Sequence, residues 1–305
     1  MIEKDDVIPD PMSDIFTASL WSDPKNEHLL RSFINGVRLN SGLSSIVQAT
    51  VLNPFNIREF NVSKRIVLDV RVKDEREHLY DVEVQNTMHT AFPNRVLDYC
   101  ADMFSSQLKK GMDYSELRPV ISIILTAFPI FPQLKEIHTI FLLTAQEDPR
   151  VVLTKDFQIH ILRLFEVMRG RVEKLSNMNI ELCNWLHFFS FGSTSTEAEM
   201  SQLTNNSPII LEAYDEMHRF FSDPATREKA IERRRFLSDY QLGMNASKAE
   251  GKADSIVIIL ADRFGVVSFS LEEKLRSLVD VGQLDRLTKF ALRCNSLEEF
   301  ENGLV

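Results

Sequence analysis

Residues 64–86, KRIVLDVRVKDEREHLYDVEVQN, contain two runs in which apolar and polar side chains alternate. The apolar positions are Ile66, Leu68, Val70 and Val72 in the first run and Tyr80, Val82 and Val84 in the second. Alternation with a period of two is typical of a strand with one buried face. The polar residues 74–78 separate the runs. The segment therefore predicts an antiparallel hairpin with one apolar face.

The opposite face of this hairpin carries acidic residues. Matching the two apolar faces, for example Val70 with Val82, puts Asp69 on the same face as Asp81, Glu83 and Gln85. If Asp69 and Glu83 lie directly opposite, their Cβ atoms are about 4.5–5.5 Å apart. Two carboxylates at that distance repel unless a cation lies between them or one is protonated. A hard divalent ion such as Mg²⁺ or Mn²⁺ suits such an oxygen-rich position.

A simpler interpretation is that these charges form a solvated hairpin face. Antiparallel strands commonly expose one polar face to water. Arg71 would then pair across the hairpin with Asp81 or Glu83. The hairpin by itself leaves both interpretations open.

The rest of the chain predicts an α/β fold with a mixed sheet flanked by helices and a helical C-terminal region. Strands are expected at residues 120–128 (VISIILTAF, an interior strand), 137–144 and 157–164. Helices are expected from Asp23-Pro24 to residue 40, and at 94–110, 181–191, 208–221, 226–246, 256–264, 271–279 and 284–294. Residues 193–207 are expected to be a loop and 248–254 a polar hinge.

This order of elements, with an Asp on one strand and Glu-x-Gln on the next, resembles the core of the PD-(D/E)XK nucleases. More narrowly it resembles the PD-(D/E)XK nuclease family transposases, related to the Rpn recombination-promoting nucleases. The resemblance covers roughly residues 11–254. The residues that carry it are 68–70, 80–85, Arg95, Tyr99, Gln107, Gly111, Tyr114, 119–123, 157–164, Trp185, Phe188, 231–239 and 249–253.

The resemblance implies a restriction-endonuclease-like fold and three site residues. Asp69 is then the motif aspartate, Glu83 the acidic residue of the E-x-K triplet, and Gln85 stands where the family pattern has lysine. Asp69 and Glu83 would bind Mg²⁺ or Mn²⁺, which lowers the pKa of a bound water. Gln85 is the departure from the pattern, because its amide orients water without carrying a charge.

Other polar residues have weaker patterns. Asp14 is a candidate for a further acid from upstream of the core, although an aspartate near a terminus is usually solvated. Arg95 and Tyr99 lie one helical turn apart, and Arg95 either approaches a DNA phosphate or pairs with Glu83 or Asp98. Lys109-Lys110 and Arg233-Arg234-Arg235 fit a salt-bridged solvent face better than a DNA contact. His138 and His160 alternate within apolar strands and are expected in the core.

The composition limits the partners and the compartment. The net charge of −9 excludes a protein that coats nucleic acid by charge alone, but residues 58–78 are close to neutral. Cys100, Cys183 and Cys294 form no CxxC pair, which favours a reducing compartment. The acidic N-terminus lacks an apolar segment, and the longest apolar run is too short to span a bilayer. We expect a cytoplasmic protein without a membrane segment.

Three functional hypotheses follow, on a chain divided into a nuclease-like domain (residues 11–222) and a helical region (223–305). The first is a Mg²⁺-dependent DNA endonuclease, in recombination or mobile-element biology. The second is a catalytically inactive nuclease fold that binds DNA or a protein. The third is a helical interaction protein that forms homo-oligomers through its C-terminal helices.

Overall fold

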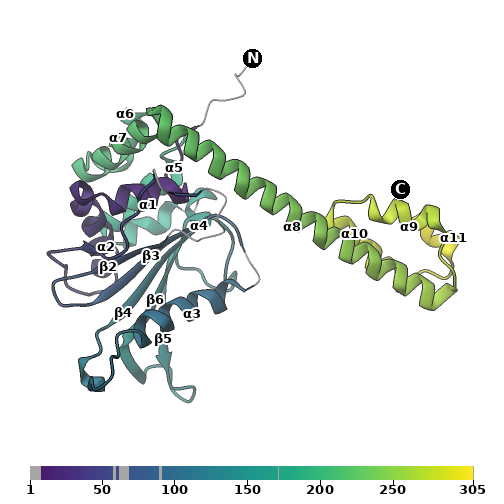
Figure 1. Cartoon of the computed structure of the whole chain (residues 1–305), viewed down its shortest axis with the longest axis horizontal. Helices are drawn as coiled ribbons and strands as arrows, with labels where there is room; N and C mark the ends of the chain where they lie inside the picture. Colours follow the sequence, from purple (N-terminus) through teal and green to yellow (C-terminus); the bar gives the residue numbers. More distant parts are fainter. Residues whose placement is uncertain (1–7, 58–59, 62–68, 89–90, 171, 305) are drawn as a thin grey trace. The chain divides into compact units, whose positions relative to one another are not determined.

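The computed structural model describes residues 8–57, 60–61, 69–88, 91–170 and 172–304. The chain divides into two compact units, the first ending at Ile231 and the second beginning at Glu232. The first unit has a mixed sheet flanked by helices and the second is helical (Figure 1). The predicted α/β fold with a helical C-terminal region is therefore confirmed.

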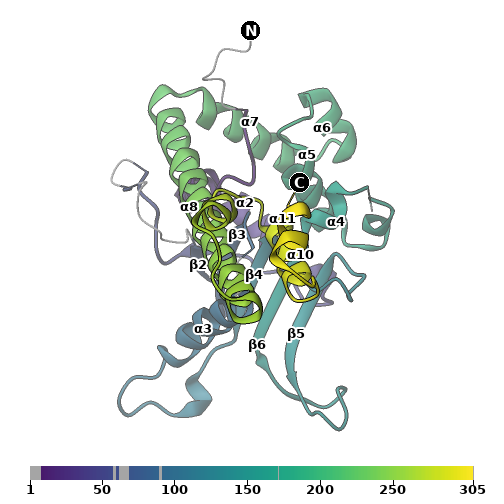
Figure 2. The same ribbon diagram turned by 90° about the vertical axis from the view of Figure 1, so that its right-hand side faces the viewer.

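Within the described residues, the sheet has six strands in the order β1-β2-β3-β4-β6-β5. Their bounds are β1 Thr50–Val51, β2 Asp69–Lys73, β3 Leu79–Gln85, β4 Val120–Thr126, β5 His138–Thr144 and β6 Val152–Arg163. β2 is antiparallel to β1 and β3, β4 is parallel to β3 and β6, and β5 is antiparallel to β6. The β5–β6 hairpin extends beyond the other strands (Figure 2). β4 is buried along its whole length, as its apolar run predicts.

The register of the β2–β3 hairpin agrees with the prediction. Val70 pairs with Val82 and Asp69 pairs with Glu83. Val70, Val72, Tyr80 and Val82 are buried on one face. The first half of the predicted strand, including Ile66 and Leu68, lies outside the described residues. The period of two determines which side chains share a face, because a slip by one residue would turn the apolar side chains of one strand to the polar face of the other.

One face of the sheet packs on a large helical layer. The layer consists of α1 Asp14–Ser22, α2 Glu27–Asn40, α5 Ile180–Phe191 and α7 Pro208–Ser222 (Figure 1). Trp21, Phe33, Trp185 and Phe189 pack together with ring centroids 5.1 to 5.9 Å apart. α2 is preceded by α1 and the short helix η1 Pro24–Asn26, so the sequence-based start at Asp23-Pro24 is too early for α2 and misses α1.

The helix α3 Phe92–Ser105 packs on the other face of the sheet, against β4 and β6. Val96, Cys100 and Met103 are buried in the two small apolar clusters on this side. The helix begins two residues before the expected residue 94 and ends well before residue 110. Pro93 lies in its first turn, where a missing backbone N–H breaks no helical hydrogen bond.

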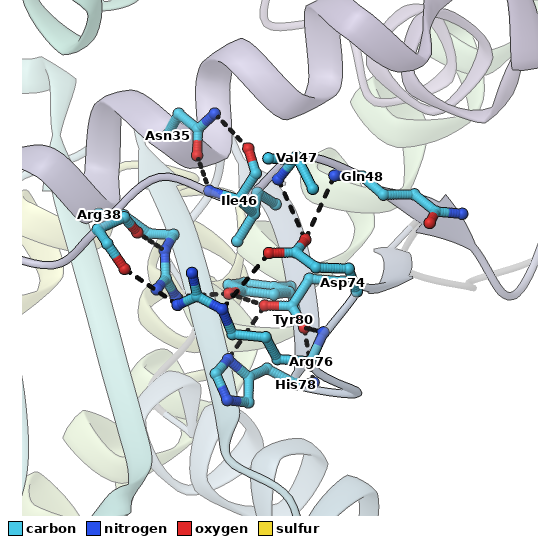
Figure 3. Close-up of polar contacts among 11 residues, drawn as sticks. Asn35, Arg38, Ile46, Val47, Gln48, Asp74, Arg76, His78 and Tyr80 are labelled. Atoms are coloured by element: carbon cyan, nitrogen blue, oxygen red, sulfur yellow. Dashed lines mark hydrogen bonds and ion pairs between the residues drawn. The ribbon is translucent and has the colours of Figure 1, made fainter.

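A polar network fastens the turn of the β2–β3 hairpin to α2. Asp74 Oδ1 accepts hydrogen bonds from the backbone N–H groups of Arg76 and His78 at 2.8 and 2.9 Å. Asp74 Oδ2 accepts from the Tyr80 hydroxyl at 2.9 Å, and that hydroxyl accepts from Arg38 Nη1 at 2.6 Å (Figure 3). Burial raises the pKa of Tyr80 well above its usual range. The network ties β3 to the helical layer far along the strand from Glu83.

His138 and His160 form a pair in which His160 is buried, as expected for a core histidine, and His138 is partly buried. His138 Nε2 lies 2.9 Å from His160 Nδ1, Asn40 Nδ2 lies 2.8 Å from His138 Nδ1, and Gln158 Oε1 lies 3.1 Å from His160 Nε2. Burial lowers the pKa of His138 from 6.5 to about 4 and that of His160 to about 3. The guanidinium of Arg38 also disfavours a proton on His160.

This pair makes the fold sensitive to acid. Between pH 6.5 and about 4 these histidines bind protons in the unfolded chain but stay neutral in the folded protein, because their folded pKa values are lowered. The free energy of unfolding therefore falls as the pH falls. We expect the two histidines to lower the free energy of unfolding by about 1–3 kcal/mol over that pH range. Urea unfolding followed by tryptophan fluorescence should give a shallower pH slope for the H138Q/H160Q variant than for wild type. The same slope in both would contradict this expectation, and H28Q, at a partly exposed histidine, is the control.

Two C-terminal expectations were wrong. Residues 193–207 are not wholly a loop, since they contain α6 Glu197–Leu203. Thr196 is the N-cap of this helix and forms a capping box with Glu199. The predicted hinge at 248–254 is helical, as part of α8 Pro224–Phe264. Ala249, Ala253, Ile256 and Leu260 repeat at helical spacing and are buried in the core of the second unit. That packing outweighs the cost of Gly251, about 1 kcal/mol in a helix interior.

The remaining elements are short. They are η2 Tyr114–Glu116, α4 Leu164–Met168, η3 Val172–Asn177, α9 Phe269–Arg276, α10 Val281–Ala291 and α11 Leu297–Asn302. The last three helices pack on the end of α8 through Leu271, Leu275, Leu284 and Phe300. Among the described residues, no helix has the length and apolarity needed to cross a membrane.

Candidate functional site

The acidic face of the hairpin is buried beneath α3. Asp81, Glu83 and Gln85 alternate along β3 and are 3%, 1% and 6% exposed. Asp69, on β2, is partly exposed and pairs in register with Glu83. The interpretation of a solvated hairpin face is therefore wrong for β3, because a helix that the hairpin pattern does not reveal covers this side.

Glu83 is at the centre of the site. Its Oε1 accepts hydrogen bonds from Gln85 Nε2 and from Arg95 Nη2, the latter at 3.3 Å. Arg95 Nη2 also donates to Gln85 Oε1 at 2.6 Å. Arg95 lies in the first turns of α3, which brings it over the end of β3. Of the two acidic partners that the sequence allowed for Arg95, the structure has Glu83.

Asp69 is held from its own strand and from the preceding loop. Arg71 Nε donates to Asp69 Oδ2 at 3.1 Å, so Arg71 pairs along β2 and not across the hairpin. Asn53 Nδ2 donates to the carbonyl of Asp69 at 3.0 Å, and Asn53 Oδ1 accepts from the N–H of Arg71 at 2.7 Å. Asn53 thus continues the β1–β2 ladder with its side chain and orients the backbone of Asp69.

Asp81 lies deeper along the same face. Its Oδ2 accepts from Ser122 Oγ on β4 at 3.2 Å. Its Oδ1 is buried without a hydrogen-bond donor in the described part of the chain. A buried carboxylate oxygen without a donor is costly when the group is ionised. The neighbouring thiol of Cys100 is also buried, and burial raises its pKa to about 12.

These surroundings raise the pKa values of both buried acids. Burial raises the pKa of Glu83 from 4.5 to about 8; Asp81 and Asp69 add to the effect, while Arg95 and Gln85 oppose it. Burial and the charge of Asp69 raise the pKa of Asp81 from 3.8 to about 7, and Ser122 and Arg71 oppose that shift. Burial, together with the repulsion between neighbouring carboxylates, therefore disfavours the simultaneous ionisation of Asp81 and Glu83 at neutral pH.

Comparison with known proteins decides the family. A family model described as PD-(D/E)XK nuclease family transposase matches residues 11–247, most of the chain. The chain belongs to the PD-(D/E)XK nuclease family transposases. Its mixed six-stranded sheet, counted over the described residues, agrees with a restriction-endonuclease-like fold. Neither a curated protein nor a solved structure matches the chain.

PD-(D/E)XK nucleases generally use divalent metal ions, and two carboxylates here fit such an ion. In the described part of the chain, Asp69 Oδ1 and Glu83 Oε2 accept no hydrogen bond. No three His, Cys, Asp or Glu side chains in that part form a group that would hold a metal alone. Mg²⁺ is commonly bound by one or two carboxylates, with water and substrate phosphates as the other ligands. Asp69 and Glu83 fit that arrangement.

Other sequence candidates lie elsewhere or have other contacts. Asp14 begins α1, and its Oδ1 accepts from the N–H of Ile15 at 2.8 Å. Tyr99 is partly buried on α3, and Lys109 and Lys110 are exposed beyond the end of that helix. Arg233 is buried, with its guanidinium 5.8 Å from the ring of Phe236.

Three residues of the site had no assigned role in the sequence. Asp81 was expected on the correct face, but only its burial under α3 makes it part of the site. Ser122 is a polar residue within the apolar run VISIILT, and that interruption is a usable signal. Asn53 has no signal in the sequence, because its partners are the backbone atoms of a strand sixteen residues away.

Proposed function

We propose that the chain is a metal-dependent DNA endonuclease that hydrolyses phosphodiester bonds, with a role in recombination or mobile-element biology. The main evidence for this proposal is that Asp69 pairs with Glu83 in register on neighbouring strands. Each presents a carboxylate oxygen that accepts no hydrogen bond from the described residues. Membership of the PD-(D/E)XK nuclease family transposases supports the same activity.

Asp69 and Glu83 would hold Mg²⁺ or Mn²⁺. When bound, the ion would lower the pKa of a water and offset charge on the phosphate oxygens. Gln85 fixes one carboxylate oxygen of Glu83 through its amide N–H, and its carbonyl is held by Arg95. Asn53 and Arg71 keep Asp69 in place from the other side. The chain's own residues thus hold and orient the two carboxylates.

The raised pKa values couple metal binding to pH. Burial raises the pKa of Glu83 to about 8, so this residue keeps its proton at neutral pH when no cation is present, whereas Asp81, with a pKa of about 7, is partly protonated. A divalent ion bound by Glu83 must displace the proton of that residue, so the apparent affinity for the ion should rise with pH until about 8. An activity that increases from pH 6 to pH 9 is the expected profile.

The decisive test is plasmid nicking by wild type and Asp69→Ala with Mg²⁺ or Mn²⁺. We expect the wild type to nick in a metal-dependent reaction and D69A to lose at least about 100-fold in rate, since it lacks one of two metal ligands. The matched control is D156A, which removes an exposed aspartate from β6. Equal cleavage by wild type and D69A would remove the site assignment.

A catalytically inactive binding module is the second candidate. It is favoured by the hydrogen bonds that Arg95 and Gln85 already make to Glu83, and by the absence of a lysine at position 85. It differs in its expected result: no cleavage with either metal, and DNA binding that D69A and E83Q leave unchanged. Fluorescence anisotropy with a labelled duplex measures that binding.

Three further expectations remain proposals. We place the nuclease-like domain at residues 11–222 and the helical region at 223–305, and limited proteolysis tests that boundary.

The three cysteines are free and buried, which supports the cytoplasm as the compartment. Self-association through the C-terminal helices is testable by light scattering of the full chain across a concentration series.

A further inference from the structure

The site lacks a positive charge at the motif position on β3. Residue 85 is a glutamine with a neutral amide, where the resemblance to the PD-(D/E)XK pattern places a lysine. Phosphodiester hydrolysis joins a water oxygen to phosphorus and breaks the bond from phosphorus to a sugar oxygen. That sugar oxygen leaves with the electron pair and takes up one proton from the water. Negative charge accumulates on the phosphate oxygens meanwhile, and a nearby cation lowers the barrier.

A guanidinium lies at this position, although it comes from a different element. Arg95 Nη2 is 2.6 Å from Gln85 Oε1 and 3.3 Å from Glu83 Oε1. The guanidinium carbon lies 6.0 Å from the centroid of the buried Phe92 ring, which limits its movement. α3 therefore carries a positive charge to the side chain of residue 85.

Arg95 also has donors to spare. Its Nε is buried and makes no hydrogen bond within the described residues. About a quarter of its side chain is exposed, at 24%, so the group is reachable from outside. An arginine with unused N–H groups can take a phosphate oxygen without giving up its contact with Gln85.

We propose that Arg95 supplies, from α3, the positive charge that a lysine at position 85 would supply from β3. It does so by donating to a non-bridging oxygen of the scissile phosphate while Gln85 holds it in place. This inference rests on the proposed nuclease function and names a further residue for it. It also explains how a site with Glu-x-Gln remains competent for hydrolysis.

Arg71 is the competing source of charge. It also contacts an acid of the site, since its Nε lies 3.1 Å from Asp69 Oδ2. However, Arg71 makes no contact with Gln85 in the described residues, and it extends along β2. R71Q removes the same charge beside the other acid of the site, so Q85K/R71Q shows whether a lysine at position 85 compensates for the loss of any site arginine or of Arg95 in particular.

The test is a set of single-turnover cleavage rates, with the protein in saturating excess over DNA, for R95Q, R95K, Q85K, Q85K/R95Q, R71Q and Q85K/R71Q. We expect R95Q to fall about 100-fold and R95K about 10-fold, with the loss in the maximal cleavage rate and not in the protein concentration that gives half of that rate. Adding Q85K should raise the rate of R95Q at least about 10-fold, because a lysine then brings the charge from β3. Adding Q85K to R71Q should bring no such gain.

A second readout separates this role from a structural one. Metal-induced thermal stabilisation should persist in R95Q, since Arg95 is not a metal ligand and its contact with Glu83 is to Oε1, the oxygen that Gln85 also holds. An R95Q rate within about threefold of wild type, or no gain from Q85K in a folded R95Q protein, would overturn the role of Arg95 alone. Absence of cleavage by every protein, wild type included, overturns the proposed function and this role with it.

Discussion

Replacing Glu83 by glutamine should abolish metal-dependent cleavage and at the same time stabilise the metal-free protein above pH 8. Burial raises the pKa of Glu83 to about 8, whereas the unfolded carboxyl titrates near 4.5. Between these values the folded protein keeps a proton that the unfolded chain releases, so stability falls as the pH rises. Glutamine does not titrate in this range, so the stability of E83Q should not fall with rising pH for this reason.

The magnitude follows from the same linkage. We expect the free energy of unfolding of E83Q to exceed that of wild type by about 2 kcal/mol at pH 9 and to be close to it at pH 5. One pKa unit corresponds to about 1.4 kcal/mol, and relaxation of the neighbouring groups reduces the full effect. Cleavage should fall at least about 1000-fold, since a buried metal ligand is lost. Added Mg²⁺ or Mn²⁺ should stabilise the wild type at pH 8 and leave E83Q unchanged.

Tryptophan fluorescence in urea is the suitable measurement. Trp21 and Trp185, the two tryptophans of the chain, both lie in the first unit and report on it alone. The control is E147Q, which neutralises an exposed glutamate and should give no pH-dependent gain. Lower stability of E83Q at pH 9, or retained cleavage, would contradict the electrostatic account of the site.

Replacing Asp74 by alanine should destabilise the first unit by about 3 kcal/mol. Asp74 is fully buried and accepts two backbone hydrogen bonds in the turn and one from Tyr80 (Figure 3). Its removal leaves these donors without an acceptor inside the protein. It also removes the negative charge near the Arg38 guanidinium, which reaches Asp74 through the Tyr80 hydroxyl.

Graded variants make this expectation specific. Y80F should cost less, about 1–2 kcal/mol, because the two turn hydrogen bonds of Asp74 survive. D74N should lie between Y80F and D74A, since its amide oxygen still accepts from the turn. Because the network lies away from Glu83, the folded fraction of each variant should keep the wild-type cleavage rate. D156A, at an exposed position, serves again as the control, and a loss below about 1 kcal/mol for D74A would refute the role of the network.

The hairpin shows how far alternation alone reaches. That Asp69 and Glu83 share a face follows from the period of two, because an odd slip would put Val70 and Val72 on the opposite face from Tyr80 and Val82. Their direct pairing does not follow, since a slip by two residues would keep the same faces. Burial of the opposite face does not follow, since it depends on α3, which begins seven residues after Gln85. The contact of Arg95 with Glu83 depends on the same docking.

The helical errors have a related cause. The polar, glycine-containing segment 248–254 predicts a hinge when taken locally, yet Ala249 and Ala253 continue an apolar stripe that only the second core makes visible. The capping box at Thr196 and Glu199 was a local signal for α6 that the polar composition obscured. Local composition fails to predict a helix where burial against residues distant in the sequence stabilises it.

The sequence by itself determined the mixed α/β architecture, which side chains share each face of the hairpin, and the two carboxylates that are candidates for a site. These depend on periodicity and on the order of elements, both of which are local properties of the chain. The tertiary structure decided that Glu83 and Asp81 are buried, that their pKa values are raised, and that Arg95 and Asn53 support the site. The physical reason is that desolvation and ion pairing depend on which elements pack together, and strand alternation is the same whether water or a helix covers the polar face.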